Sequence, residues 1–155
     1  MISSRKTSLH ILLSLDNDAA ARRAAGAAIE FAALGAGVTY EMSRDFAAAF
    51  SAAARLISHR QGETVQRLSC VIDNRRGEVR LELAAEDGSS LRSVPATSPD
   101  AWKAISRRVS VLQWKPAHAH GGKKAGRVRS PVNLLMVQKR RGVEAGAAGS
   151  RSRRK

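Results

Sequence analysis

Three polar side chains have a spacing that could serve chemistry on one helix. Ser51, Arg55 and His59 are four residues apart, so a helix through them places all three on one face. The simplest interpretation is a solvent-exposed helix face, and a face that binds a ligand is the alternative. His118 and His120 could bind a metal weakly, but no third ligand is suitably spaced, and a plain loop explains them.

Several chemistries are excluded by what the sequence lacks. There is no Gly-x-Ser-x-Gly nucleophile motif and no Gly-x-x-x-x-Gly-Lys-Ser/Thr phosphate loop. Cys70 is the single cysteine, which excludes an intramolecular disulfide and a multi-cysteine zinc site. We therefore expect Cys70 to be a small buried side chain in a strand, and we expect neither a catalytic residue nor a metal site.

The positive charge of the chain is concentrated in its C-terminal third. Residues 1–102 hold 12 basic and 12 acidic side chains, whereas residues 103–155 hold 15 basic side chains and only Glu144 as an acid. Such cations neutralise phosphates, which predicts nucleic-acid binding without sequence preference. An acidic protein, an anionic membrane surface, a solubilising tail without a partner and a read-through segment without function are the alternatives. The nucleic-acid candidates are Lys123, Lys124, Arg127, Arg129, Lys139, Arg140, Arg141, Arg151, Arg153, Arg154 and Lys155.

The first half of the chain predicts one strand and two helices. Residues 8–15 read as a strand, and the polar cluster 16–18 can cap an Ala-rich helix over 18–34. A second helix is expected over 39–60. Its large apolar side chains recur at steps of three and four and should face the core; they are Met42, Phe46, Phe50, Ala53 and Ile57.

The second half predicts a hairpin, a short helix and one or two further strands. Strands over 64–72 and 79–83 flank a turn at 73–77, because Asp, Asn and Gly tolerate turn geometry. A helix near 100–108 and a strand at 109–114 should follow. The apolar run 132–137 is either a last strand or a docking segment, and residues 139–155 should be disordered.

These elements predict an α+β fold. We expect a sheet of about four to five mixed or antiparallel strands packed by two or three helices. The domain should span residues 1–115, and a disordered, flexible basic tail should span 116–155.

Over roughly residues 8–115, the order of elements resembles that of the anti-sigma-factor serine kinases, which belong to the histidine-kinase-type (Bergerat) ATPase superfamily. In that family the second helix carries Glu, Asn and His four residues apart; the Asn holds Mg²⁺ and the Glu supports catalysis. Ser51, Arg55 and His59 stand at these positions, so only the histidine matches. The Asp-x-Gly-x-Gly turn that contacts adenine would fall at Asp87 and Gly88, and no glycine-rich lid follows.

The resemblance implies a degenerate nucleotide site. Arg55 would put a cation where Mg²⁺ sits, and a guanidinium cannot ligate a metal. We therefore expect a regulatory or binding protein rather than an enzyme, and no cofactor unless the resemblance extends to ATP and Mg²⁺. A sigma factor is one candidate partner. The alternative is a nucleic-acid-binding accessory protein that uses the basic tail. No apolar run is long enough for membrane insertion, and a cytoplasmic location is expected.

Overall fold

Eight helices and strands follow one another along the described part of the chain. The computed structural model describes residues 9–16, 18–58, 67–75, 77–88, 91, 99–116 and 132–140. In order, the elements are β1 Leu9–Asp16, α1 Ala19–Gly35, α2 Tyr40–Ser58, β2 Arg67–Arg75, β3 Glu78–Ala85, α3 Pro99–Ser106, β4 Val111–Pro116 and β5 Val132–Lys139. None of the helices in these ranges has the length and apolar character to cross a membrane.

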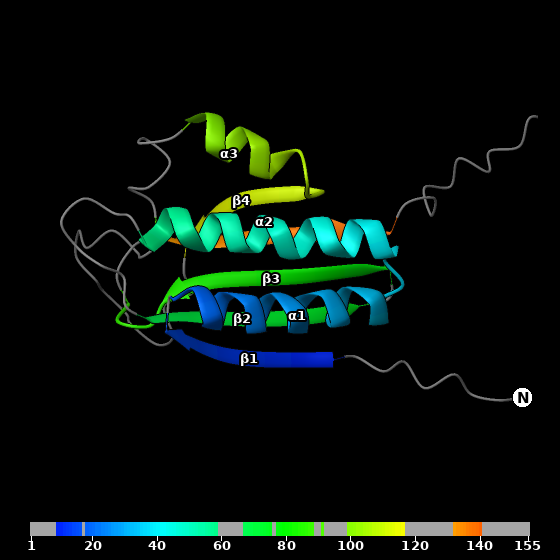
Figure 1. Cartoon of the computed structure of the whole chain (residues 1–155), viewed down its shortest axis with the longest axis horizontal. Coiled ribbons are helices and arrows are strands. Elements are labelled where there is room, and N and C mark those ends of the chain that lie inside the picture. The colour runs from blue at the N-terminus through cyan, green and yellow to red at the C-terminus, as the bar shows by residue number, and fades with distance from the viewer. Residues whose placement is uncertain are drawn as a thin grey trace, which may run out of the picture.

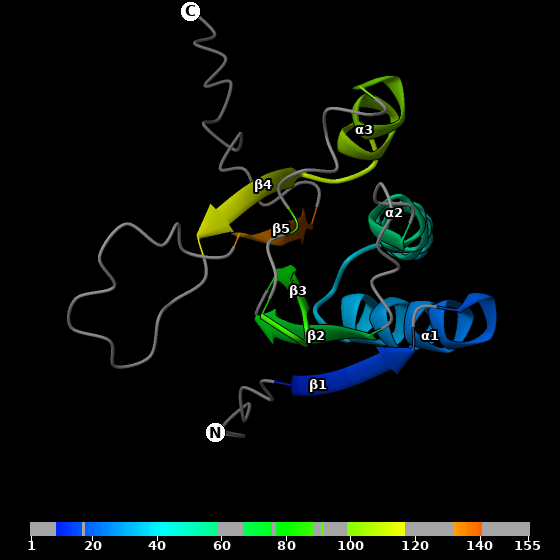
Figure 2. The same cartoon turned by 90° about the vertical axis from the view of Figure 1, so that its left-hand side faces the viewer.

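The five strands form one antiparallel sheet in the order β1-β2-β3-β5-β4. Figure 1 shows α1 and α2 lying side by side along the strands, and Figure 2 shows all three helices on one face of the sheet. This arrangement confirms the predicted α+β class. Of the two predicted alternatives, a mixed or an antiparallel sheet, the structure has the antiparallel one.

The strand β5 changes the expected domain boundary. The sequence predicts a tail over 116–155, but Val132–Lys139 pairs with β3 on one side and with β4 on the other. Leu134 and Met136 are fully buried in the core. A segment that occupies the interior of the sheet belongs to the folded unit, so the boundary at 115 does not hold for β5, and Lys139 lies in a strand rather than in the tail.

The helix α1 begins at the expected polar cluster. The Asp18 carboxylate accepts a hydrogen bond from the Ala21 backbone N–H at 2.7 Å, which satisfies one of the free amides of the first turn. The backbone reverses after the helix at Gly37, whose φ of 87° is costly for other residues. This turn leads directly into α2, which packs against α1 on the sheet.

The core is formed by the predicted face of α2 against alternating side chains of the sheet. Phe46, Phe50, Ala53 and Ile57 are fully buried, and the fifth predicted member, Met42, is half-buried. At the far side of the core, α3 contributes Trp102, whose ring makes an edge contact with Trp114 of β4 at 5.2 Å between centroids. The helix and strand lie close to their expected positions.

One sequence-based expectation was wrong at the β2–β3 hairpin. The sequence predicts a turn at residues 73–77, but Asp73, Asn74 and Arg75 lie in β2, and the pairing with β3 extends to Arg75 and Glu78. Gly77 adopts a positive φ of 81° and forms the reversal. The hairpin loop is shorter than expected because Asn74, a frequent turn residue, is buried in β2 and pairs with Val79 of β3.

Candidate functional site

The two described members of the predicted stripe, Ser51 and Arg55, lie on the side of α2 away from the core. Ser51 is half-buried and Arg55 is exposed in the last turn of the helix. His59, the third member of the stripe, lies outside the described residues. The exposed guanidinium of Arg55 can donate several hydrogen bonds to a phosphate or a carboxylate, but it has no lone pair to offer a metal ion.

Asp87 and Gly88 form the turn that follows β3. Both are exposed, Gly88 has a φ of 77°, and its backbone N–H donates to the Ala85 carbonyl at 3.1 Å. Figure 1 shows that β3 and α2 end at the same end of the molecule. The fold therefore brings the Arg55 end of the helix and the Asp87-Gly88 turn to the same end of the domain.

The region around Arg55 and Asp87 presents one guanidinium and one carboxyl group from two different elements. Among the described residues, no group of three or more His, Cys, Asp or Glu side chains is arranged to hold a metal ion. A shallow hollow of about 270 Å³ lies on the N-terminal half of α2, away from Arg55. It is lined by Tyr40, Glu41, Arg44, Asp45 and Ala48, and the Arg44 guanidinium stands 5.8 Å from the Tyr40 ring centroid.

The buried side chain of Gln138 holds three parts of the fold together, and the sequence analysis missed it. Its Nε2 donates to the carbonyls of Met42 in α2 and Arg108 after α3, at 3.2 and 3.0 Å. Its Oε1 accepts from both the backbone N–H and the hydroxyl of Ser110, each at 3.0 Å. The alternation of Leu134, Met136 and Gln138 is the signal that could have placed this amide on the core face.

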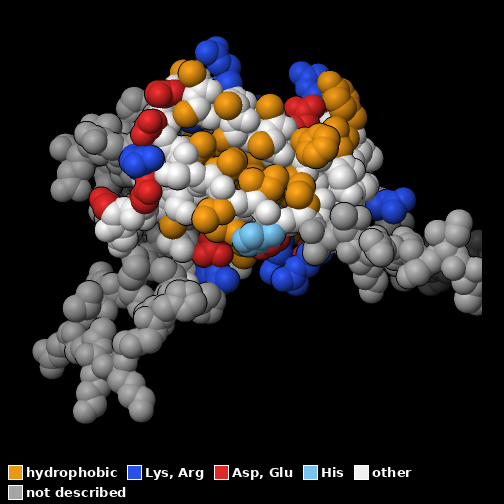
Figure 3. Space-filling model, turned by 90° about the horizontal axis from the view of Figure 1, so that it is seen from below, with side chains coloured by type: hydrophobic (Ala, Val, Ile, Leu, Met, Phe, Trp, Pro, Cys, Tyr) orange, Lys and Arg blue, Asp and Glu red, His pale blue; other side chains and the backbone are white. Residues whose placement is uncertain are grey.

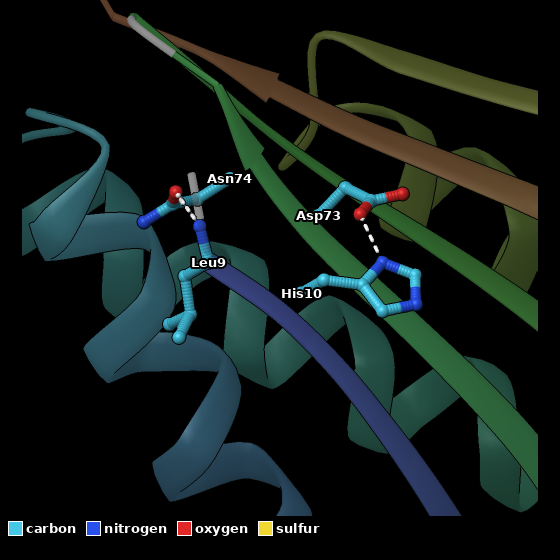
Figure 4. Close-up of polar contacts among 4 residues, drawn as sticks. All are labelled: Leu9, His10, Asp73 and Asn74. Atoms are coloured by element: carbon cyan, nitrogen blue, oxygen red, sulfur yellow. Dashed lines mark hydrogen bonds and ion pairs between the residues drawn. The ribbon is translucent and has the colours of Figure 1, made fainter. Parts of the chain in front are cut away.

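The start of β1 is fastened to the end of β2 by two polar contacts on opposite faces (Figure 4). The Leu9 backbone N–H donates to Asn74 Oδ1 at 2.8 Å, and Asn74 Nδ2 donates to the Ala32 carbonyl of α1 at 3.4 Å. His10 Nδ1 and Asp73 Oδ1 are 2.5 Å apart on the helix-free face. These contacts fix the register of β1.

Two of the eleven cationic candidates are described, and both lie at the end of β5. Lys139 is exposed in the strand, and the Arg140 backbone N–H donates to the Gly77 carbonyl at 2.8 Å. Across the sheet, Glu78 pairs with Arg75 on one side and with Lys139 on the other. Arg75, Glu78 and Lys139 therefore carry a net positive charge together. The other nine candidates, Lys123, Lys124, Arg127, Arg129, Arg141, Arg151, Arg153, Arg154 and Lys155, lie outside the described residues.

Cys70 is fully buried in β2, as expected. Burial raises the pKa of its thiol from 9.0 to about 12, because the thiolate would lose its hydration inside the core. The thiol is therefore protonated at neutral pH and unsuited to nucleophilic chemistry.

Comparison with known proteins adds no family assignment: no protein-family model matches the chain, and no curated protein is significantly similar to it.

Proposed function

We propose that this protein is a small cytoplasmic regulator that acts by protein–protein contact, on a degenerate domain of the anti-sigma-factor kinase type. A sigma factor is the partner class that this resemblance implies. The observation that carries the proposal is the position of Arg55. It is exposed at the end of α2, at the same end of the domain as the Asp87-Gly88 turn.

The arrangement supports binding without turnover. In a kinase of this type, an amide oxygen on the second helix would hold Mg²⁺ against the nucleotide phosphates. Arg55 offers only donors and a positive charge, so it repels the metal that the transfer step requires. Ser51 stands where a carboxylate would support catalysis, and a hydroxyl is a far weaker base at neutral pH. The domain then acts through the surface that it presents to a partner.

A phosphate-release assay tests the absence of turnover. We expect no Mg²⁺-dependent release of phosphate from ATP by the purified full chain. The variant Arg55→Ala is compared with Lys103→Ala, which removes another exposed cation from the last turn of a different helix. Release by the wild-type chain that disappears in Arg55→Ala and persists in Lys103→Ala would contradict the proposal and identify Arg55 as part of an active site.

A second candidate function is nucleic-acid binding, and the end of β5 favours it. Arg75, Lys139 and Arg140 are exposed there, and Glu78 is the acid between the first two. Glu78 also contacts Arg80, with Oε1 and Nε 3.2 Å apart. The segment 141–155 continues from this point with five more basic residues and one acid. Contacts from these cations would reach phosphates and carry no base specificity.

Truncation separates this function from the folded domain. The chain must be cut after Arg140, because an earlier cut would remove β5 from the interior of the sheet. If the five cations of 141–155 each meet a phosphate on duplex DNA, the slope of log affinity against log salt should flatten by about 4.5 units at most. The control keeps the length and replaces only Glu144 by Gln. Binding with an unchanged slope after truncation would contradict this second function.

A further inference from the structure

Five exposed cations lie near one end of the domain, although they belong to three separate segments of the chain. One ends β2, one ends β5 and is followed by the next, and two come directly after α3. We call this group the basic corner; it consists of Arg75, Arg107, Arg108, Lys139 and Arg140. Figure 1 shows β5 ending at the end of the domain where β3 begins. Arg107 and Arg108 are not among the predicted nucleic-acid candidates, because no local pattern places them beside β5.

Two hydrogen bonds hold the turn after α3 against the end of β5. The Lys139 backbone N–H donates to the Ser110 hydroxyl at 3.0 Å. One residue earlier in β5, Gln138 Nε2 donates to the Arg108 carbonyl, also at 3.0 Å. The cations of these two segments are therefore neighbours in the folded chain, although about thirty residues separate them in the sequence.

The positive charge of the basic corner is not neutralised within the described part of the chain. Arg75 and Lys139 are the cross-strand neighbours of Glu78, but Glu78 Oε1 lies 3.2 Å from Arg80 Nε. Among the described residues, none of the five cations forms an ion pair, whereas Arg67 contacts two carboxylates. The first turns of α2, which begin at the same end, add one arginine and two acids, so the sum stays positive.

We propose that the basic corner binds duplex DNA through its phosphate groups. The inference rests on the second proposed function, and it assigns nucleic-acid binding to the folded domain in addition to the segment 141–155. Phosphates would neutralise the five cations, and the DNA would release counterions. The face over α1 and β1 offers a polyanion less, because Figure 3 shows hydrophobic side chains over its middle and most charged side chains around its margin.

The width of the basic corner matches the major groove of a DNA duplex. From Arg75 on β2 to the turn before β4, it crosses three strand spacings of about 4.8 Å each, or about 14 Å in all. The major groove of B-DNA is about 12 Å wide, so cations at the two ends of the basic corner can contact phosphates on both sides of the groove. Residues 73–77, 107–110 and 138–140 contain no aromatic side chain on which the bases of a single strand could stack.

The backbone that carries these cations is fixed before DNA binds. The Arg140 N–H donates to the Gly77 carbonyl at 2.8 Å, and the Arg107 N–H donates to the Lys103 carbonyl at 3.2 Å. The Arg140 side chain also lies beside Gly37, where an added Cβ would be 3.8 Å from Arg140 Cδ. A binding surface that is already ordered loses less conformational entropy when its ligand binds.

Fluorescence anisotropy of a labelled DNA duplex with the full chain, at several salt concentrations, tests the proposal. The double variant Arg107→Ala/Arg108→Ala removes two exposed cations and keeps the Arg108 carbonyl that accepts from Gln138. If both cations meet a phosphate, the slope of log affinity against log salt should flatten by about 1.8 units. The control Arg23→Ala/Arg67→Ala removes the same charge from exposed positions in the first half of α1 and at the start of β2. It should leave the slope unchanged.

The outcomes separate the basic corner from the segment 141–155. A slope that flattens equally in both double variants would overturn the proposal, because net charge alone would then set the affinity. A slope that flattens on truncation after Arg140 but not in Arg107→Ala/Arg108→Ala would overturn it too, and would leave the second proposed function in place. Tighter binding of a single strand than of the duplex with the same sequence would contradict the choice of duplex DNA. A wild-type chain that binds no DNA at all would contradict both the basic corner and the second proposed function.

Discussion

Replacement of Gln138 tests whether β5 is fastened to the helical layer as the structure shows. The side chain is 2% exposed and makes four hydrogen bonds, two through Nε2 and two through Oε1. The variant Gln138→Met keeps nearly the same volume and removes all four bonds. It therefore separates hydrogen bonding from packing, which Gln138→Ala would not do.

The expected loss of stability in Gln138→Met depends on the polar groups that lose Gln138 as a hydrogen-bond partner. In this variant the Ser110 backbone N–H keeps a partner, because it also donates to the Val137 carbonyl at 2.9 Å. Ser110 is exposed, so its hydroxyl can hydrogen-bond to water. The carbonyls of Met42 and Arg108 each lose a donor. At about 1 to 1.5 kcal/mol for each group, Gln138→Met should lower the free energy of unfolding by about 2 to 3 kcal/mol.

A second variant reverses the polarity at the same position. Gln138→Glu replaces the donor Nε2 by an oxygen that faces two carbonyls, so the ionised form should cost about 3 to 5 kcal/mol. Burial would raise the folded-state pKa of this carboxyl above its unfolded value. The variant should therefore be more stable, relative to wild type, below the unfolded pKa of about 4.3 than at neutral pH.

Urea unfolding followed by tryptophan fluorescence measures these differences, since Trp102 and Trp114 are in contact within the fold. The control is Gln113→Met, on the exposed side of β4, which should change stability by no more than about 0.5 kcal/mol. A loss below about 0.5 kcal/mol for Gln138→Met, with an unchanged m-value, would refute the reasoning.

Three further predictions concern the core. Phe46→Ala and Phe50→Ala should each lower the free energy of unfolding by about 3–5 kcal/mol in urea titrations; losses below about 1 kcal/mol at both would contradict the buried helix face. Gly26→Ala should raise it by about 0.5–1 kcal/mol, because the residue is inside α1 and an added Cβ meets nothing within 4 Å. A thiol reagent should label Cys70 only on unfolding, because burial raises the thiol pKa to about 12; rapid labelling of the native protein would contradict this.

Much of the fold could be predicted from local patterns. The 3.6-residue spacing of Phe46, Phe50 and Ile57 identified the buried face of α2, and Asp18 identified the start of α1. The alternation of Leu68, Cys70 and Ile72 identified β2. These features depend on residues close together in sequence, and local periodicity reports them directly.

Non-local features could not be predicted in the same way. Asn74 is a frequent turn residue, but it is buried in β2 because Leu9 and Ala32 supply its hydrogen-bond partners. The strand β5 lies between β3 and β4, and its partners in β3 are more than fifty residues away in the sequence. Of the candidate site, the exposed position of Arg55 followed from helix periodicity. Its common end with the Asp87-Gly88 turn depends on how α2 lies along β3, which no local pattern encodes.

The affinity of the full chain for purified sigma factors from the same organism, measured with and without Mg²⁺ and ATP, tests the proposed function most directly. A regulator that acts by contact, with Arg55 at the degenerate site, should bind at least one sigma factor saturably, with the same Kd in both conditions. A chain that binds none of them, or binds only when Mg²⁺ and ATP are both present, would contradict the account.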